Sequence, residues 1–127
     1  MKRTLLVLNT AVAVGSAVSA VIGALHPTFV LATETEPSAG LQMYAQAYAA
    51  RAVPLAVGLV HLLRREHRAL VPVLAVAGVA QLGDLYIGVD RGVTGMAVGA
   101  TLAAVTHLGT AWWLTRRTVA PSLGSAG

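Results

Sequence analysis

Four long apolar stretches leave few folds open to this chain. They run from Thr4 to Leu25, from Leu41 to Leu63, from Leu70 to Val89 and from Gly95 to Leu114. Each is close to the length of about 20 residues with which an α-helix crosses the hydrocarbon core of a bilayer. A helix pairs its own backbone groups in lipid, whereas an open sheet would leave an unpaired edge. The sequence therefore predicts an all-α protein, a four-transmembrane-helix bundle over residues 1–117.

The composition agrees with a surface that lipid covers. Hydrophobic residues make up 56% of the 127 residues and charged residues only 11%, which is about half the charged fraction of an ordinary soluble domain. The net charge is +4, but the basic residues lie at the ends of the apolar stretches rather than in one patch, so we expect no nucleic-acid partner. The absence of cysteine excludes disulfides and thiolate metal sites.

The basic residues predict an orientation in the membrane. Arg91 lies between the third and fourth stretches, and Arg51 lies within the second. The other seven of the nine all fall on one side of a four-span topology: Lys2, Arg3, Arg64, Arg65, Arg68, Arg116 and Arg117. Positive charge in short loops marks the cytoplasmic side. We therefore expect a multi-pass protein of the bacterial inner (plasma) membrane, with both termini in the cytoplasm.

The two ends of the chain and the longest connection carry further expectations. Lys2 and Arg3 before an apolar run that contains Ser19 are typical of a cleaved signal peptide. The run continues to Leu25, however, which favours a first helix that stays in the protein. Residues 118–127 are predicted to be a disordered cytoplasmic tail. The connection of residues 26–40 is expected to be a polar loop whose residues 29–31 dip into the membrane interface.

Small residues recur at four-residue spacing in three of the stretches. Because lipid provides no hydrophobic force between helices, close packing depends on small side chains. The spacing predicts tight helix contacts along three stripes: Ala11, Gly15, Ser19 and Gly23; Ala80, Asp84 and Gly88; and Gly95, Gly99, Ala103 and His107.

Polar side chains within the apolar stretches are the candidate functional residues. A charge at membrane depth is costly, so Arg51 needs a partner or a wet cavity. The helical rise places it about 4 Å along the membrane normal from Asp84, within reach of an arginine side chain. We therefore predict an ion pair between Arg51 and Asp84. Gln81, Tyr48 and His107 are expected nearby, and Tyr44 shares the face of Arg51.

Two interpretations of this cluster stay open. As a functional site, it would use Asp84, His107 and Tyr48 as catalytic groups, and Arg51, Gln81 and Tyr44 as substrate-binding groups. As a structural feature, the ion pair would fix the register of the helices, and a lone histidine is more often a packing residue. No cofactor is expected: His61 and His107 differ by about 9 Å in depth, which disfavours a haem held by both, and there is no clear set of metal ligands.

Two segments carry a resemblance to known proteins. The stretch from Ala45 to Leu59 and the stretch from Val79 to Gly88 resemble small four-helix bacterial membrane proteins of unknown function, in the DoxX-like neighbourhood. The resemblance covers most of the chain and implies the four-helix fold. It also implies a recurring arginine, Gly-Asp pair and histidine, which would be Arg51, Gly83–Asp84 and His107. Pro54 departs from the pattern and leaves the local shape of the second helix open.

Three functions are compatible with the sequence. The first is a small membrane protein, either an accessory factor in a homodimer or larger membrane complex, or a protein that binds a lipophilic small molecule. The second is a small membrane enzyme of the isomerase or cyclase type, with Asp84 as general acid acting on a lipophilic substrate. The third is a proton-coupled transporter. We rank it last, because small drug exporters place a carboxylate in their first helix and the first stretch here has none.

Overall fold

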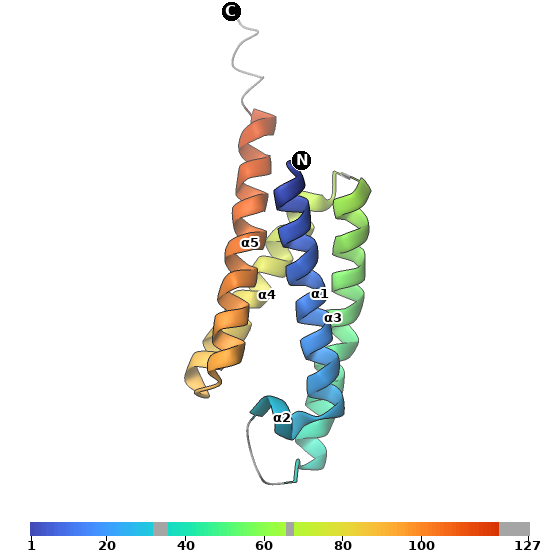
Figure 1. Ribbon diagram of the computed structural model, residues 1–127, viewed down its shortest axis with the longest axis vertical. Coiled ribbons are helices and arrows are strands. Elements are labelled where there is room, and N and C mark those ends of the chain that lie inside the picture. Colours follow the sequence, from blue (N-terminus) through green and yellow to red (C-terminus); the bar gives the residue numbers. More distant parts are fainter. Residues whose placement is uncertain (32–35, 66–67, 120–127) are drawn as a thin grey trace, which may run out of the picture.

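The fold is all-α, as predicted. The structure, a computed structural model, describes residues 1–31, 36–65 and 68–119, and these ranges contain helices and no strand. The helices are α1 (Arg3–Leu25), α2 (Pro27–Leu31), α3 (Ala39–Arg65), α4 (Leu70–Asp90) and α5 (Thr94–Val119) (Figure 1). The four long helices contain the four apolar stretches. Residues 118 and 119, which were assigned to the tail, belong to α5, and residues 120–127 lie outside the described residues.

The long helices form two antiparallel pairs. α1 packs mainly against α3, and α4 packs mainly against α5. The pairs are joined chiefly through α1 and α5, whereas α3 and α4 make few contacts. In Figure 1 the pairs lie close together at the end where α1 begins and α5 ends, and they diverge toward the opposite end. The molecule therefore has one closed end and one open end.

Two helix ends have clear local causes. Ser38 caps α3, because its hydroxyl accepts a hydrogen bond from the Leu41 amide at 3.2 Å. α4 ends in a Schellman motif, in which the Val93 amide donates to the Gly88 carbonyl at 2.8 Å and the Gly92 amide donates to the Val89 carbonyl at 3.2 Å. Gly92 has φ of 68°, a conformation that glycine adopts without strain. This turn reverses the chain within a few residues and sets α5 directly against α4.

Two glycines of α4 permit its close approach to α5. A Cβ atom at Gly78 would lie 2.5 Å from Leu108 Cγ, and one at Gly88 would lie 2.7 Å from the backbone nitrogen of Ala97. The predicted stripes are only partly correct, because a Cβ atom added at Gly15, Gly95 or Gly99 would meet open space. A small residue packs closely only where the helix faces a neighbour, and four-residue spacing does not specify which face that is.

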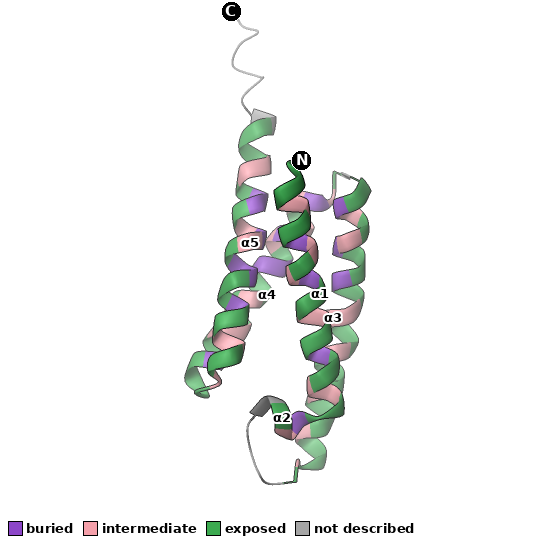
Figure 2. Ribbon diagram, in the orientation of Figure 1, coloured by how far each residue is buried: buried purple, intermediate pink, exposed green. Residues whose placement is uncertain are grey.

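A core of leucine and alanine fills the closed end. Its buried members are Ala13, Ala56, Leu59, Leu63, Leu70, Leu74, Ala77 and Ala111. The buried residues of Figure 2 gather where the two helix pairs meet, while the diverging ends are mostly exposed. Leu63 and Leu70 flank the α3–α4 connection, so the core lies beside the basic residues of that connection. Close contact between these side chains stabilises the bundle at this end.

Three of the described helices, α1, α3 and α4, are long and apolar enough to cross a membrane. α5, which has 26 residues and includes threonines, glycines, His107 and a tryptophan pair, is not among these three. The connection after α1 also differs from the prediction, because its first residues form the short helix α2 rather than a loop. Residues 33–35 of the predicted polar loop, two threonines and a glutamate, lie outside the described residues.

Candidate functional site

A cavity of about 370 Å³ lies between the two helix pairs. Of the six predicted site residues, it brings together five: Tyr48, Arg51, Gln81, Asp84 and His107. The remaining wall consists of small and apolar side chains plus one serine: Ala13, Ser16, Ala52, Leu55, Ala56, Leu59, Ala77, Ala80 and Ile87. Tyr44, the sixth predicted residue, is 71% exposed and does not line the cavity. The cavity thus combines apolar walls with a few polar groups, as small-molecule sites do.

The predicted ion pair between Arg51 and Asp84 is wrong. The Tyr48 hydroxyl donates a hydrogen bond of 2.7 Å to Asp84 Oδ2, and no ion pair joins Arg51 to Asp84 in the part of the chain that the structure describes. The helical rise gives the reason. Tyr48 precedes Arg51 by three residues and so lies about 4.5 Å further toward the open end, which brings it level with Asp84. A rigid phenol at the same depth reaches the carboxylate directly.

Arg51 instead folds back along its own helix. Its Nε donates to the Ala47 carbonyl at 3.2 Å. α3 continues without interruption through Pro54. The bond to Ala47 engages Nε, so the two terminal nitrogens of the guanidinium stay available at the cavity wall. Arg51 therefore brings a positive charge to the cavity without being neutralised by Asp84.

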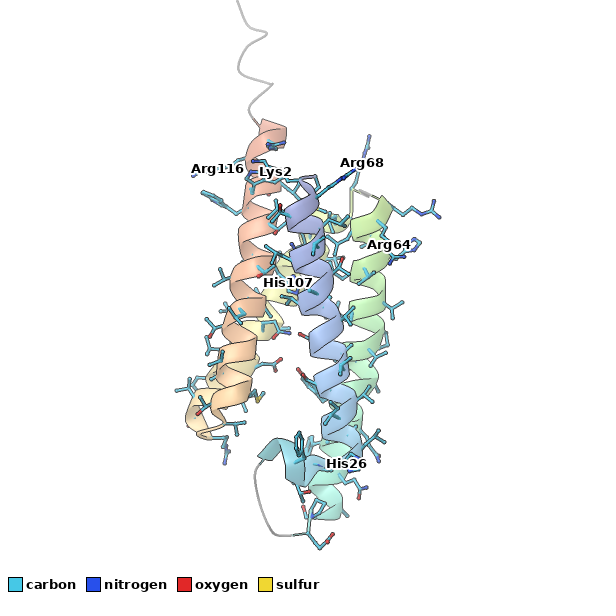
Figure 3. The ribbon with its side chains drawn as sticks, viewed as in Figure 1. Lys2, His26, Arg64, Arg68, His107 and Arg116 are labelled. Atoms are coloured by element: carbon cyan, nitrogen blue, oxygen red, sulfur yellow. The ribbon has the colours of Figure 1, made fainter. Side chains whose placement is uncertain are left out.

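His107 belongs to a buried hydrogen-bond network that links α1 to α5. Its Nδ1 lies 2.8 Å from Asn9 Oδ1. Asn9 Nδ2 donates to the Leu5 carbonyl and to Thr110 Oγ1, both at 2.8 Å. Thr110 donates in turn to the Thr106 carbonyl at 2.8 Å. Asn9, His107 and Thr110 are at most 2% exposed, so the network joins the two helix pairs in the interior. His107, which is labelled in Figure 3, also lines the cavity.

The donors in this network fix the state of the imidazole. The Leu5 carbonyl can only accept, so the atom of Asn9 that faces it is the amide nitrogen and the atom that faces His107 is the oxygen. His107 must therefore carry a proton on Nδ1, and in the neutral ring Nε2 holds a lone pair.

The sequence prediction missed Asn9, Thr110 and Ser16. Asn9 is the sole asparagine of the chain and lies within the first apolar stretch. An amide at that depth needs a partner from a neighbouring helix, which is a signal that the sequence does contain. Ser16 accepts a long hydrogen bond of 3.5 Å from Gln81 Nε2 across α1 and α4. Its partner could not be foreseen, since serine commonly bonds within its own helix.

α3 and α4 form the most loosely packed wall of the cavity. Most of its lining comes from these two helices, and they make the fewest contacts of any neighbouring pair of long helices. Leu55 and Ile87, which line the cavity from α3 and α4, are both more than one-third exposed. An apolar molecule could therefore reach the cavity sideways, past these two side chains.

The described residues contain no group of three histidine, aspartate or glutamate side chains that could hold a metal ion. Comparison with known proteins gives no further guide: no family model, no curated protein and no solved structure matches the chain. The resemblance to DoxX-like proteins stays a prediction. The function must therefore be argued from the cavity itself.

Proposed function

We propose that the protein is a four-span inner-membrane protein that binds a lipophilic small molecule between its two helix pairs. The observation that carries this proposal is the cavity of about 370 Å³, which has apolar walls and polar groups at two depths. An engineered apolar cavity of about 150 Å³ already binds benzene. The present cavity suits a molecule with roughly twice the volume of benzene or more.

The distribution of charge and aromatic residues supports a fourth span and cytoplasmic termini. Lys2, Arg64, Arg68 and Arg116 gather at the closed end, and His26 lies at the opposite end (Figure 3). At the closed end of α5 the Arg116 and Arg117 guanidiniums stack on Trp112 and Trp113, each 3.8 Å from the ring centroid. Tryptophan and arginine together are typical of the cytoplasmic membrane interface. Val98, Leu102 and Val105 form an exposed apolar stripe on α5 that lipid would cover.

The two depths of polar groups give the ligand an orientation. Tyr48, Asp84 and Arg51 lie nearer the open end. By the helical rise, His107 lies about 10 Å deeper than Asp84 and about 6 Å deeper than Arg51. Arg51 at the opening suits a carbonyl or anionic group. Asp84 Oδ2 accepts a hydrogen bond from Tyr48, and His107, another of the predicted catalytic groups, lies too far from Asp84 to act with it on one atom. Binding is therefore better supported than the isomerase or cyclase alternative.

Cysteine labelling tests the topology directly, because the chain has no cysteine of its own. We expect Thr94→Cys to react with a membrane-impermeant maleimide in intact cells, and Ser122→Cys to react only after lysis. Labelling of both positions under the same condition would show that α5 does not cross the bilayer.

A cavity-filling substitution tests the binding site. The probe is tritiated 2-naphthol, measured by scintillation proximity on protein in nanodiscs, with empty nanodiscs as the baseline. Ala52 lines the cavity, while Ala50 on the same helix is exposed and does not. We expect Ala52→Phe to weaken binding at least tenfold and Ala50→Phe to leave it unchanged. Equal binding to both variants and the wild type would contradict the proposal.

A further inference from the structure

The deep end of the cavity holds a polar atom that the fold leaves without a protein partner. His107 is 2% exposed and lines the cavity. Its only hydrogen bond within the described residues is the one from Nδ1 to Asn9. Among those residues, every fully buried side-chain nitrogen or oxygen has a partner. Nε2 has none, so it cannot be fully enclosed, and the surface onto which it opens is the cavity.

The network makes Nε2 an acceptor. Asn9 Oδ1 accepts a hydrogen bond from the protonated Nδ1 of His107, and the Asn9 amide group donates to the Leu5 carbonyl and to Thr110 Oγ1. With Nδ1 committed as the donor, the neutral imidazole presents the Nε2 lone pair to the cavity. Asn9 is thus a positioning residue, which holds both the tautomer and the plane of the ring.

We infer that the ligand is a lipophilic alcohol or phenol whose hydroxyl group donates to Nε2 of His107. This inference rests on the proposed function and narrows it to a chemical class. A ketone or ether has no hydrogen to donate to this lone pair. An ammonium ion would donate, but the carboxylate that could balance its charge, Asp84, lies about 10 Å away along the helix axes. Besides His107, the buried residues of the cavity wall are Ala13, Ala56, Leu59 and Ala77, whose apolar side chains suit the carbon skeleton of such a ligand.

A matched pair of probes measures the contribution of that hydroxyl. 2-Naphthol donates a hydrogen bond, and 2-methoxynaphthalene has the same ring system without the donor. We expect wild-type protein in nanodiscs to bind 2-naphthol about tenfold more tightly, in line with one hydrogen bond to a buried acceptor. Both affinities are taken from competition against tritiated 2-naphthol.

The variant His107→Asn distinguishes the contributions of the two ring nitrogens. Its amide nitrogen replaces Nδ1 and can still donate to Asn9, but nothing replaces Nε2. We expect the tenfold preference to fall to about one, with the affinity for 2-methoxynaphthalene changed by less than twofold. His61→Asn, the same substitution at an exposed histidine outside the cavity, is the control and should keep the preference. Loss of the preference in Asp84→Asn but not in His107→Asn would overturn the inference and assign the hydroxyl to the open end.

A measurement on unsubstituted His107 covers the case in which His107→Asn does not fold. In a background of His26→Gln, His61→Gln and His67→Gln, ¹⁵N-labelled histidine reports on His107 alone. We expect 2-naphthol, but not 2-methoxynaphthalene, to shift the Nε2 resonance upfield while Nδ1 stays in place. If both probes bind the wild type equally and Ala52→Phe blocks both, the proposed function stands and this inference fails. If neither probe binds, the proposed function fails first.

Discussion

The closed and open ends of the bundle use polar residues in different ways. In the closed end, Asn9, His107 and Thr110 are fully buried, and all but one of their side-chain hydrogen-bonding atoms are engaged within the protein. Toward the open end, Tyr48, Arg51 and Asp84 lie beside the cavity with substantial exposure, and only Tyr48 and Asp84 bond to each other. Where the helix pairs converge, polar groups hold the fold together. Where the pairs diverge, similar groups line the cavity and stay partly exposed.

The largest expected effect concerns the leucine core of the closed end. Leu74 is 0% exposed, whereas Leu82 on the same helix is 45% exposed. We expect Leu74→Ala to lower the free energy of unfolding by about 2–4 kcal/mol, because the truncated side chain leaves a cavity. Leu82→Ala should change it by less than about 1 kcal/mol. Thermal unfolding followed by circular dichroism measures both, and equal losses would mean that the two ends are packed alike.

A smaller loss of unfolding free energy is expected at Gly88, the glycine at which α4 packs closely against α5. A methyl group at Gly88 would press on the backbone of Ala97, whereas one at Gly83 meets open space. Gly88→Ala should therefore cost about 1–3 kcal/mol through overpacking. Gly83→Ala should be neutral or slightly stabilising, because alanine favours the helix. The same unfolding assay applies, and a neutral Gly88→Ala would show that the helices separate easily at this end.

Disrupting the buried network of Asn9, His107 and Thr110 should lower the free energy of unfolding by somewhat less than Gly88→Ala does. Asn9→Ala leaves the Nδ1 donor of His107 without its partner, and we expect a loss of about 1–2 kcal/mol. Thr101→Ala is the control, since exposed Thr101 bonds only to the Ala97 carbonyl of its own helix. Comparable losses in the two variants would argue that the network does not join α1 to α5 energetically.

The smallest effect is expected at the open end. Tyr48→Phe removes the hydrogen bond to Asp84 at an exposed site, so the loss of stability should be about 0.5 kcal/mol. A double-mutant cycle of Tyr48→Phe with Asp84→Asn should show coupling, and a cycle of Arg51→Gln with Asp84→Asn should be additive. Additivity in the Tyr48–Asp84 cycle with coupling in the Arg51–Asp84 cycle would instead support an ion pair between Arg51 and Asp84, and would contradict the contrast between the two ends.

The helices and the candidate residues can be predicted from the amino-acid sequence. The length and apolarity of the stretches predict the helices, since lipid permits almost no other backbone arrangement. The polar side chains within those stretches identify Tyr48, Arg51, Gln81, Asp84 and His107, all of which line the cavity. The clustering of basic residues at one end also follows from the sequence alone, because the chain reverses direction at each connection.

Which of these residues contact one another depends on how the helices pack. Tyr48 rather than Arg51 bonds to Asp84, and His107 bonds to Asn9 rather than to the cluster on α3 and α4. Those choices depend on how each helix is rotated about its axis and where the two pairs diverge. Lipid and apolar side chains are similar environments, so a mostly apolar helix does not reveal which face points inward. The rotation is set by close contacts such as Gly78 against Leu108, which form only in the packed bundle.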